Sequence, residues 1–191
     1  RPLHALNPAL ADDCLRIAVE LWDKTRERDP ADRVKAAVEL LITTKDARYR
    51  DFLVQHAGLI AGDFRRFGWL AGRTLPLISD AGYRGQLLEA AKAYRTAIDK
   101  LSAKTPYGVP YEPAIWGAGW GIQRFGAEQV FLHESFPEVF STTYLMDALN
   151  FILGCHPGSN TASFVSGVGA KSLIPGYGFN RADGSYLPGG V

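Results

Sequence analysis

The two parts of this chain of 191 residues differ so strongly in composition that they predict different kinds of structure. Residues 1–104 hold 32 of the 41 charged side chains but only 6 of the 20 glycines. Residues 105–191 hold the other 9 charged side chains, 14 glycines and 7 of the 11 prolines. The first part is therefore typical of helices with solvated faces, and the second of long loops around a few buried helices.

Apolar residues recur at helical spacing through both parts. In the first helix, which opens at Asn7 and Pro8, one face carries Leu10, Cys14, Ile17, Ala18 and Leu21. A second helix starts at Asp29 and Pro30. Further helices are expected over residues 47–64, 83–102, 122–134 and 142–154.

The remaining segments predict breaks and loops rather than strands. Gly68 and Gly72 are expected to interrupt a short apolar stretch, and residues 155–191 to be mostly loop. No long alternating stretch indicates a sheet. The predicted fold class is therefore all-α, built from helix pairs joined by functional loops, and the length is enough for one ordinary globular domain.

Composition excludes several classes of protein. No apolar run approaches the roughly 18 residues of a membrane span, so no membrane partner is expected. A formal net charge of +1 gives no strong electrostatic footprint for nucleic acid. The two cysteines, Cys14 and Cys155, exclude a disulfide-rich scaffold, and each is expected to be a small buried residue.

The usual catalytic motifs give no candidate residue in this chain. The four histidines lack metal-ligand spacing, so neither a metal nor another cofactor is expected. Asp12 and Asp13 lie in the first turn of a helix, where acids complement the helix dipole. Glu112, Glu128 and Glu134 are isolated and are expected to be solvated.

The most informative segment covers residues 107–121, where four large aromatic residues stand among glycines and prolines: Tyr107, Tyr111, Trp116 and Trp120. Flat aromatic faces on a stiff loop suit stacking against sugar rings, and they equally suit packing against neighbouring helices. A second Gly-rich loop, residues 159–190, contains Arg181, which is either a surface residue or a donor to substrate hydroxyls.

Residues 149–157 read Leu-Asn-Phe-Ile-Leu-Gly-Cys-His-Pro, and residues 163–169 read Ser-Phe-Val-Ser-Gly-Val-Gly. These two runs resemble glycoside hydrolase family nine. Residues 149–157 are similar to the family's helix that ends in Leu-Gly-x-Asn-Pro, and residues 163–169 to its Ser-Tyr-Val-x-Gly-x-Gly run. Trp116 and Gly117 match the family's Trp-Gly loop. The resemblance is most specific over residues 105–191 and weaker over residues 1–104.

This resemblance implies that residues 1–191 are the C-terminal portion of a single catalytic domain, an incomplete six-hairpin α/α barrel from an inverting, endo-β-1,4-glucanase-like glycoside hydrolase. The family's catalytic Asp pair and acid Glu would lie outside this chain, so the fragment alone is expected to be inactive. About seven or eight helices fit its length, whereas six hairpins need twelve. The implied partners are a β-linked oligo- or polysaccharide and the remainder of the catalytic domain, and the implied location is secreted or periplasmic.

The implied substrate contacts are all aromatic or cationic: Tyr111, Trp116, Trp120, Phe179 and Arg181. Arg181 matches the Arg of the family's His-His-Arg loop, but Phe179 replaces its first His. Trp120 stands where many members place an Arg, and His156 replaces the Asn of the Leu-Gly-x-Asn-Pro motif.

These departures leave other functions open. One is an exo-acting β-glucosidase or β-glucosaminidase of the same family. Another is a non-catalytic helical module that binds carbohydrate or protein, and a third is a different helical-barrel enzyme such as an epimerase.

Overall fold

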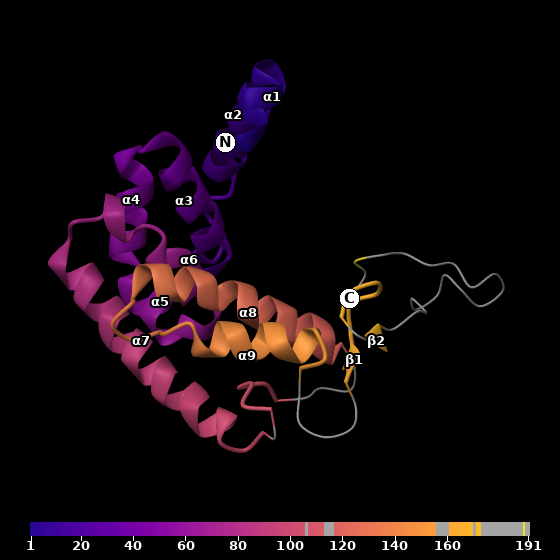
Figure 1. The fold of residues 1–191 in the computed structure, drawn as a ribbon. Coiled ribbons are helices and arrows are strands. Elements are labelled where there is room, and N and C mark those ends of the chain that lie inside the picture. The colour runs from indigo at the N-terminus through magenta and orange to yellow at the C-terminus, as the bar shows by residue number, and fades with distance from the viewer. Residues whose placement is uncertain (106, 113–116, 156–160, 170, 173–188, 190–191) are drawn as a thin grey trace. The chain divides into compact units, whose positions relative to one another are not determined.

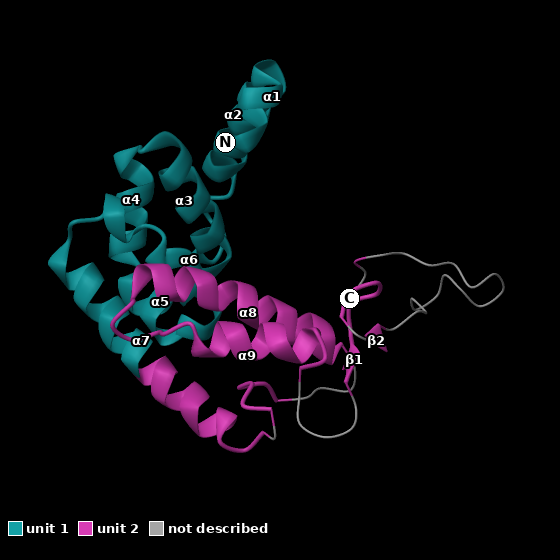
Figure 2. Ribbon diagram, viewed as in Figure 1, with its two compact units in different colours: residues 1–92 teal, residues 93–191 magenta. Residues whose placement is uncertain are grey.

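The computed structural model describes residues 1–105, 107–112, 117–155, 161–169, 171–172 and 189. Over these residues the chain is mainly helical, with a single short pairing of two strands, so the predicted all-α class is confirmed (Figure 1). The chain divides into two compact units, residues 1–92 and residues 93–191 (Figure 2). None of the helices in the described ranges is long and apolar enough to span a bilayer.

Unit 1 consists of short and medium helices in sequence order. They are α1 (Pro2–Leu6), α2 (Pro8–Lys24), α3 (Pro30–Thr44), α4 (Ala47–Gln55), α5 (Ala57–Gly62), α6 (Phe64–Gly72), a 3-10 turn (Leu75–Leu77) and the start of α7 (Ala81–Ser102). The predicted helix starts are confirmed, because the Asn7 side chain accepts the N–H of Leu10 and the Asp29 side chain accepts the N–H of Ala31. A proline follows each of these capping residues.

The core of unit 1 forms around α3, whose face of Val34, Ala37, Val38 and Leu41 is buried. Trp22 of α2 lies edge-on to Tyr49, with ring centroids 5.2 Å apart. The guanidinium of Arg33 lies 3.7 Å from the centroid of the Trp22 ring and donates to the Trp22 carbonyl. This cluster ties the C-terminal end of α2 to α3 and α4.

The single helix predicted over residues 47–64 is wrong. The chain leaves helical geometry at His56, whose Nδ1 hydrogen-bonds the carbonyl of Phe52 over 2.7 Å, and again at Asp63. The break expected at Gly68 is also wrong, because Gly68 lies inside α6. There the Phe64 ring occupies the place of a side chain, since a Cβ on Gly68 would lie 2.5 Å from that ring.

The apolar face predicted for α2 exists but is not covered in unit 1. Leu10, Ile17 and Leu21 are 49%, 47% and 56% exposed, and Cys14 is exposed as well. Trp22, near the C-terminal end, is the residue that α2 buries. Figure 1 shows α1 and α2 projecting from the rest of unit 1.

Unit 2 is built on a pair of helices, α8 (Ala118–Ser135) and α9 (Thr143–Ile152), which lie side by side (Figure 1). Gly126 permits their close approach, because a Cβ there would lie 3.0 Å from the Cβ of Ala148. The end of α7 joins them, since the Tyr144 hydroxyl donates to Asp99 over 2.5 Å. Beyond α9, β1 (Ala162–Ser163) pairs in parallel with β2 (Lys171–Ser172).

Candidate functional site

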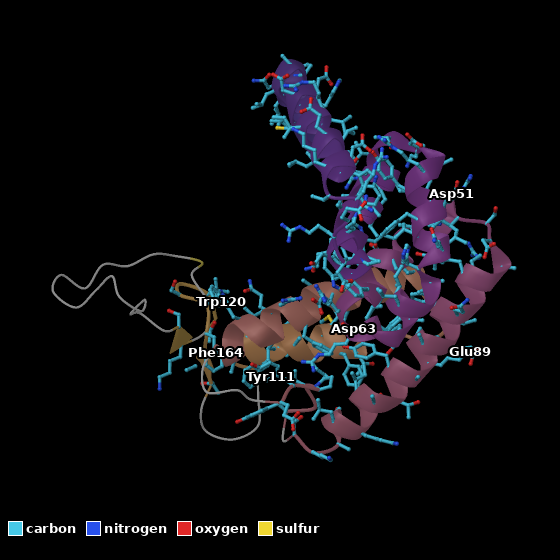
Figure 3. The ribbon with its side chains drawn as sticks, turned by 180° about the vertical axis from the view of Figure 1, so that it is seen from behind. Asp51, Asp63, Glu89, Tyr111, Trp120 and Phe164 are labelled. Atoms are coloured by element: carbon cyan, nitrogen blue, oxygen red, sulfur yellow. The ribbon has the colours of Figure 1, made fainter. Side chains whose placement is uncertain are left out.

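Aromatic side chains gather where α8 begins and α9 ends. We call this group the aromatic cluster, and its members are Tyr107, Tyr111, Trp120, Phe151 and Phe164. Figure 3 labels Tyr111, Trp120 and Phe164 at this end of the α8–α9 pair. Of the residues predicted as substrate contacts, Tyr111 and Trp120 thus belong to the cluster, while Trp116, Phe179 and Arg181 lie outside the described residues.

Trp120 is the most exposed member of the aromatic cluster. It stands in the first turn of α8, and 75% of its surface is accessible. Gly117, which precedes this turn, has a φ of +81°, a conformation that L side chains rarely adopt. Since an indole ring is mostly apolar, such exposure leaves a large flat face ready to contact a ligand.

Tyr111 packs on the start of α8 through a glycine. A Cβ on Gly121 would collide with the Tyr111 ring, so the ring can occupy this position only because residue 121 has no side chain. The Tyr111 N–H also donates to the carbonyl of Val109 over 2.8 Å. These contacts place the Tyr111 ring against Gly121, which follows Trp120 in α8.

The other three members form a row of rings. The Tyr107 ring meets Phe151 edge-on with centroids 5.0 Å apart, and Phe151 stacks on Phe164 with centroids 5.2 Å apart and an interplanar angle of 16°. Tyr107 remains 40% exposed, whereas Phe151 and Phe164 are half-buried. Tyr107 is therefore a partly exposed ring that rests on Phe151, which in turn stacks on Phe164.

The loop that carries Tyr107 is held by hydrogen bonds from the end of α7. The Ser102 hydroxyl donates to the Gly108 carbonyl over 2.7 Å, and the Thr105 hydroxyl donates to the Val109 carbonyl over 2.9 Å. Val109 is almost completely buried. Gly108 adopts a φ of +69°, which only glycine accommodates readily.

Asp147 is the one carboxylate among the described residues that combines contact with this loop and a shifted pKa. It lies on α9, and a Cβ on Gly108 would lie 3.4 Å from its Oδ2 atom. Burial raises the pKa of Asp147 above the ordinary value of an aspartate. The sequence offered no signal for it, because an isolated aspartate in a helix resembles any solvated one.

The carboxylates considered from sequence are placed differently. Glu112 and Glu134 are exposed, as expected. Glu128 is instead mostly covered and forms an ion pair with Arg124 over 2.7 Å.

The expectation that Cys14 and Cys155 are buried is wrong, because both are exposed, and Cys155 lies just after the end of α9. Among the described residues, no group of three or more His, Cys, Asp or Glu side chains could hold a metal ion.

Unit 1 contains a separate groove of about 870 Å³ between α2 and α3. Its lining is mainly apolar and includes Ala11, Leu15, Ala18 and Leu40, with Arg33 at its edge. None of the residues predicted as substrate contacts lines it. The groove continues the uncovered apolar face of α2.

Comparison with known proteins adds no relative: no family model matches the chain, and neither the curated proteins nor the solved structures contain a significant match. The function must therefore be argued from the aromatic cluster and from the motifs of the sequence.

Proposed function

We propose that this chain is the C-terminal part of an inverting glycoside hydrolase that resembles family nine and that its aromatic cluster binds a β-linked glucan. The observation that carries the proposal is the exposed ring of Trp120, which is followed in α8 by Gly121, the residue against which the Tyr111 ring is seated. An exposed indole ring holds apolar surface in water, which is unfavourable. Covering the ring with a ligand removes that surface from water and so favours binding.

The chemistry of a pyranose fits this surface. The axial C–H groups of a β-linked glucose ring form an apolar face, and that face stacks on an aromatic ring. Gly121 seats the Tyr111 ring, and the hydrogen bonds from Ser102 and Thr105 hold the adjoining loop. A surface held in this way loses little conformational entropy when it binds.

Hydrolysis would depend on groups outside this chain. An inverting glycosidase needs an acid and a base on opposite sides of the sugar, with a water between them. We propose that the remainder of the catalytic domain supplies them and completes the six-hairpin α/α barrel. The uncovered apolar face of α2, with Leu10, Ile17 and Leu21, supports packing of further helices against unit 1. A polymeric substrate is consistent with a secreted or periplasmic protein.

Binding of cellopentaose to the 191-residue chain, measured by titration calorimetry, tests the proposal. We expect measurable binding that Trp120→Ala weakens about fivefold, since stacking on an aromatic face is worth on the order of 1 kcal/mol. Leu10→Ala, which truncates an exposed apolar side chain in the other unit, is the matched control and should leave the affinity unchanged.

Two results would contradict the proposal. Absence of any oligosaccharide binding, or equal affinity in the Trp120→Ala variant, would remove the aromatic cluster as a sugar site. Release of reducing sugar by the purified chain would show that the catalytic groups are not elsewhere. Binding that persists without hydrolysis after the chain is joined to the rest of its domain would favour a non-catalytic carbohydrate-binding module.

A further inference from the structure

We propose that Tyr107 and Asp147 together form a second sugar subsite, in which a pyranose ring lies on Tyr107 while one of its hydrogen-bond donors reaches Asp147. The inference rests on the proposed carbohydrate function and adds to it a polar group that fixes the orientation of the sugar. Neither residue belongs to the exposed Trp120 and Tyr111 pair that carries the proposed function.

The two groups are brought together by one helix and one loop. Asp147 and Phe151 stand four residues apart on α9 and therefore share a face, one turn apart. Two consecutive loop residues cover that face, because Gly108 meets Asp147 and the Tyr107 ring meets Phe151. The carboxylate of Asp147 and the ring of Tyr107 are thus associated with neighbouring turns on one face of α9.

The geometry is fixed before any ligand binds. Gly108 is held through its carbonyl by Ser102, and its φ of +69° lies in the left-handed region that favours glycine. Phe164 stacks on the far side of Phe151 and so supports the ring on which Tyr107 rests. A site held at both ends in this manner meets the usual requirement that a binding group be positioned by rigid neighbours.

The charge of Asp147 is available for a ligand. Asp99, nearby in unit 2, already accepts from Tyr144 and forms an ion pair with Arg95 over 2.8 Å. Asp147, by contrast, has neither a hydrogen-bond donor nor a cation as partner among the described residues. A half-buried carboxylate without a partner is unfavourable, and a donor from a ligand relieves that cost.

The chemistry points to a donor on the sugar. A carboxylate accepts hydrogen bonds and donates none when ionised, so it selects hydroxyl groups or a protonated amino group. Glucose and glucosamine units both offer such donors beside a stackable ring face. The two sources differ in charge, since a protonated amino group adds an ionic attraction that a hydroxyl lacks.

The test compares four variants of the 191-residue chain: Tyr107→Leu, Asp147→Asn, Trp120→Ala and Glu134→Gln. Cellopentaose and the glucosamine pentamer are titrated into each at pH 6. We expect Tyr107→Leu and Asp147→Asn each to weaken binding about fivefold to tenfold. Glu134→Gln, which neutralises an exposed carboxylate near the C-terminal end of α8, should bind as the unmodified chain does. Circular dichroism and thermal unfolding check that each variant folds.

Further outcomes separate the possible donors and the possible failures. An equal loss for both sugars in Asp147→Asn identifies a hydroxyl donor, and a larger loss for the glucosamine pentamer identifies the amino group. Tyr107→Phe, which keeps the ring, should retain affinity even if Tyr107→Leu folds poorly. If Trp120→Ala weakens binding while Tyr107→Leu and Asp147→Asn do not, the subsite is wrong and the proposed function stands. If the chain binds neither sugar, both are wrong.

Discussion

The turn that follows α9 depends on Gly154, and replacing this glycine should be among the most damaging single changes in unit 2. Gly154 has a φ of +83°. A Cβ at this position would lie 2.5 Å from the carbonyl oxygen of Thr161, 2.8 Å from the carbonyl carbon of Ala162 and 2.9 Å from the nitrogen of Ser163. All three are backbone atoms and cannot rotate away as the end of a long side chain can.

The cost of Gly154→Ala has two parts. A positive φ costs an L residue about 1–2 kcal/mol. Displacing the backbone of residues 161–163 adds about 1–3 kcal/mol, the usual range for inserting a methyl group into packed structure. We therefore expect a loss of roughly 3 kcal/mol in the stability of this part of the chain.

Two further glycines separate these contributions. Gly117 has a φ of +81° with nothing within 4 Å of a Cβ, so Gly117→Ala should cost only the backbone term, about 1–2 kcal/mol. Gly85 lies inside α7 in open space, so Gly85→Ala should stabilise the helix by about 0.5–1 kcal/mol. The expected loss of stability on substitution by alanine thus rises from the helical Gly85, through Gly117 with its positive φ, to Gly154, which has a positive φ and also contacts backbone.

Amide hydrogen exchange measures the effect locally, which matters because the chain contains two compact units. The amide of Cys155 donates to Asn150, and that of Phe164 donates to Ile152. In Gly154→Ala both should exchange roughly a hundredfold faster than in the unmodified chain, as a loss of about 3 kcal/mol requires. Exchange at the rate found in Gly117→Ala would refute the predicted backbone clash.

Three further perturbations concern charge and aromatic packing. Burial by itself raises the pKa of Glu39, but hydrogen bonds from two arginines outweigh it and lower the pKa. Glu39→Gln should therefore destabilise the chain by less than about 1 kcal/mol at pH 7, and the difference should shrink in urea titrations as the pH falls below the ordinary range of a glutamate. Burial raises the pKa of Tyr83 to about 12, so stability should fall as the pH rises from about 10 to 12, and Tyr83→Phe should flatten that decline in circular dichroism. Arg33→Met removes the cation above Trp22 and should lower the unfolding free energy by about 1–2 kcal/mol, whereas an unchanged urea midpoint would contradict this contribution.

Local signals in the sequence predicted much of the fold. The Asn-Pro and Asp-Pro pairs at Asn7 and Asp29 predicted two helix starts, because capping side chains and N-terminal prolines act within a few residues. The break at His56 was not predictable in this way, since it contains neither proline nor a positive φ. Gly68 gave the opposite error, because a glycine that makes room for the ring of Phe64 has the same local signature as a glycine that ends a helix.

The site was predictable only where composition alone revealed it. Trp120 and Tyr111 drew attention because aromatic residues rarely alternate with glycine and proline. The seat of the Tyr111 ring on Gly121, and the row from Tyr107 to Phe164, are tertiary contacts across residues 107–164. Asp147 was missed for the same reason, since the absence of a partner around a carboxylate is a property of the folded chain.

The turn at Gly154 and the aromatic cluster depend on each other. Phe164 can stack on Phe151 only because the chain reverses within the residues after α9 and returns the Phe164 amide to the carbonyl of Ile152 over 2.8 Å. The accessible ring of Tyr107 rests in turn on Phe151. Disturbing the turn should therefore weaken sugar binding at Tyr107 while leaving Trp120, which stands on α8 and makes none of these contacts, free to bind. A Gly154→Ala variant that lost stability but kept its full affinity for cellopentaose would show that the row of rings has no part in binding.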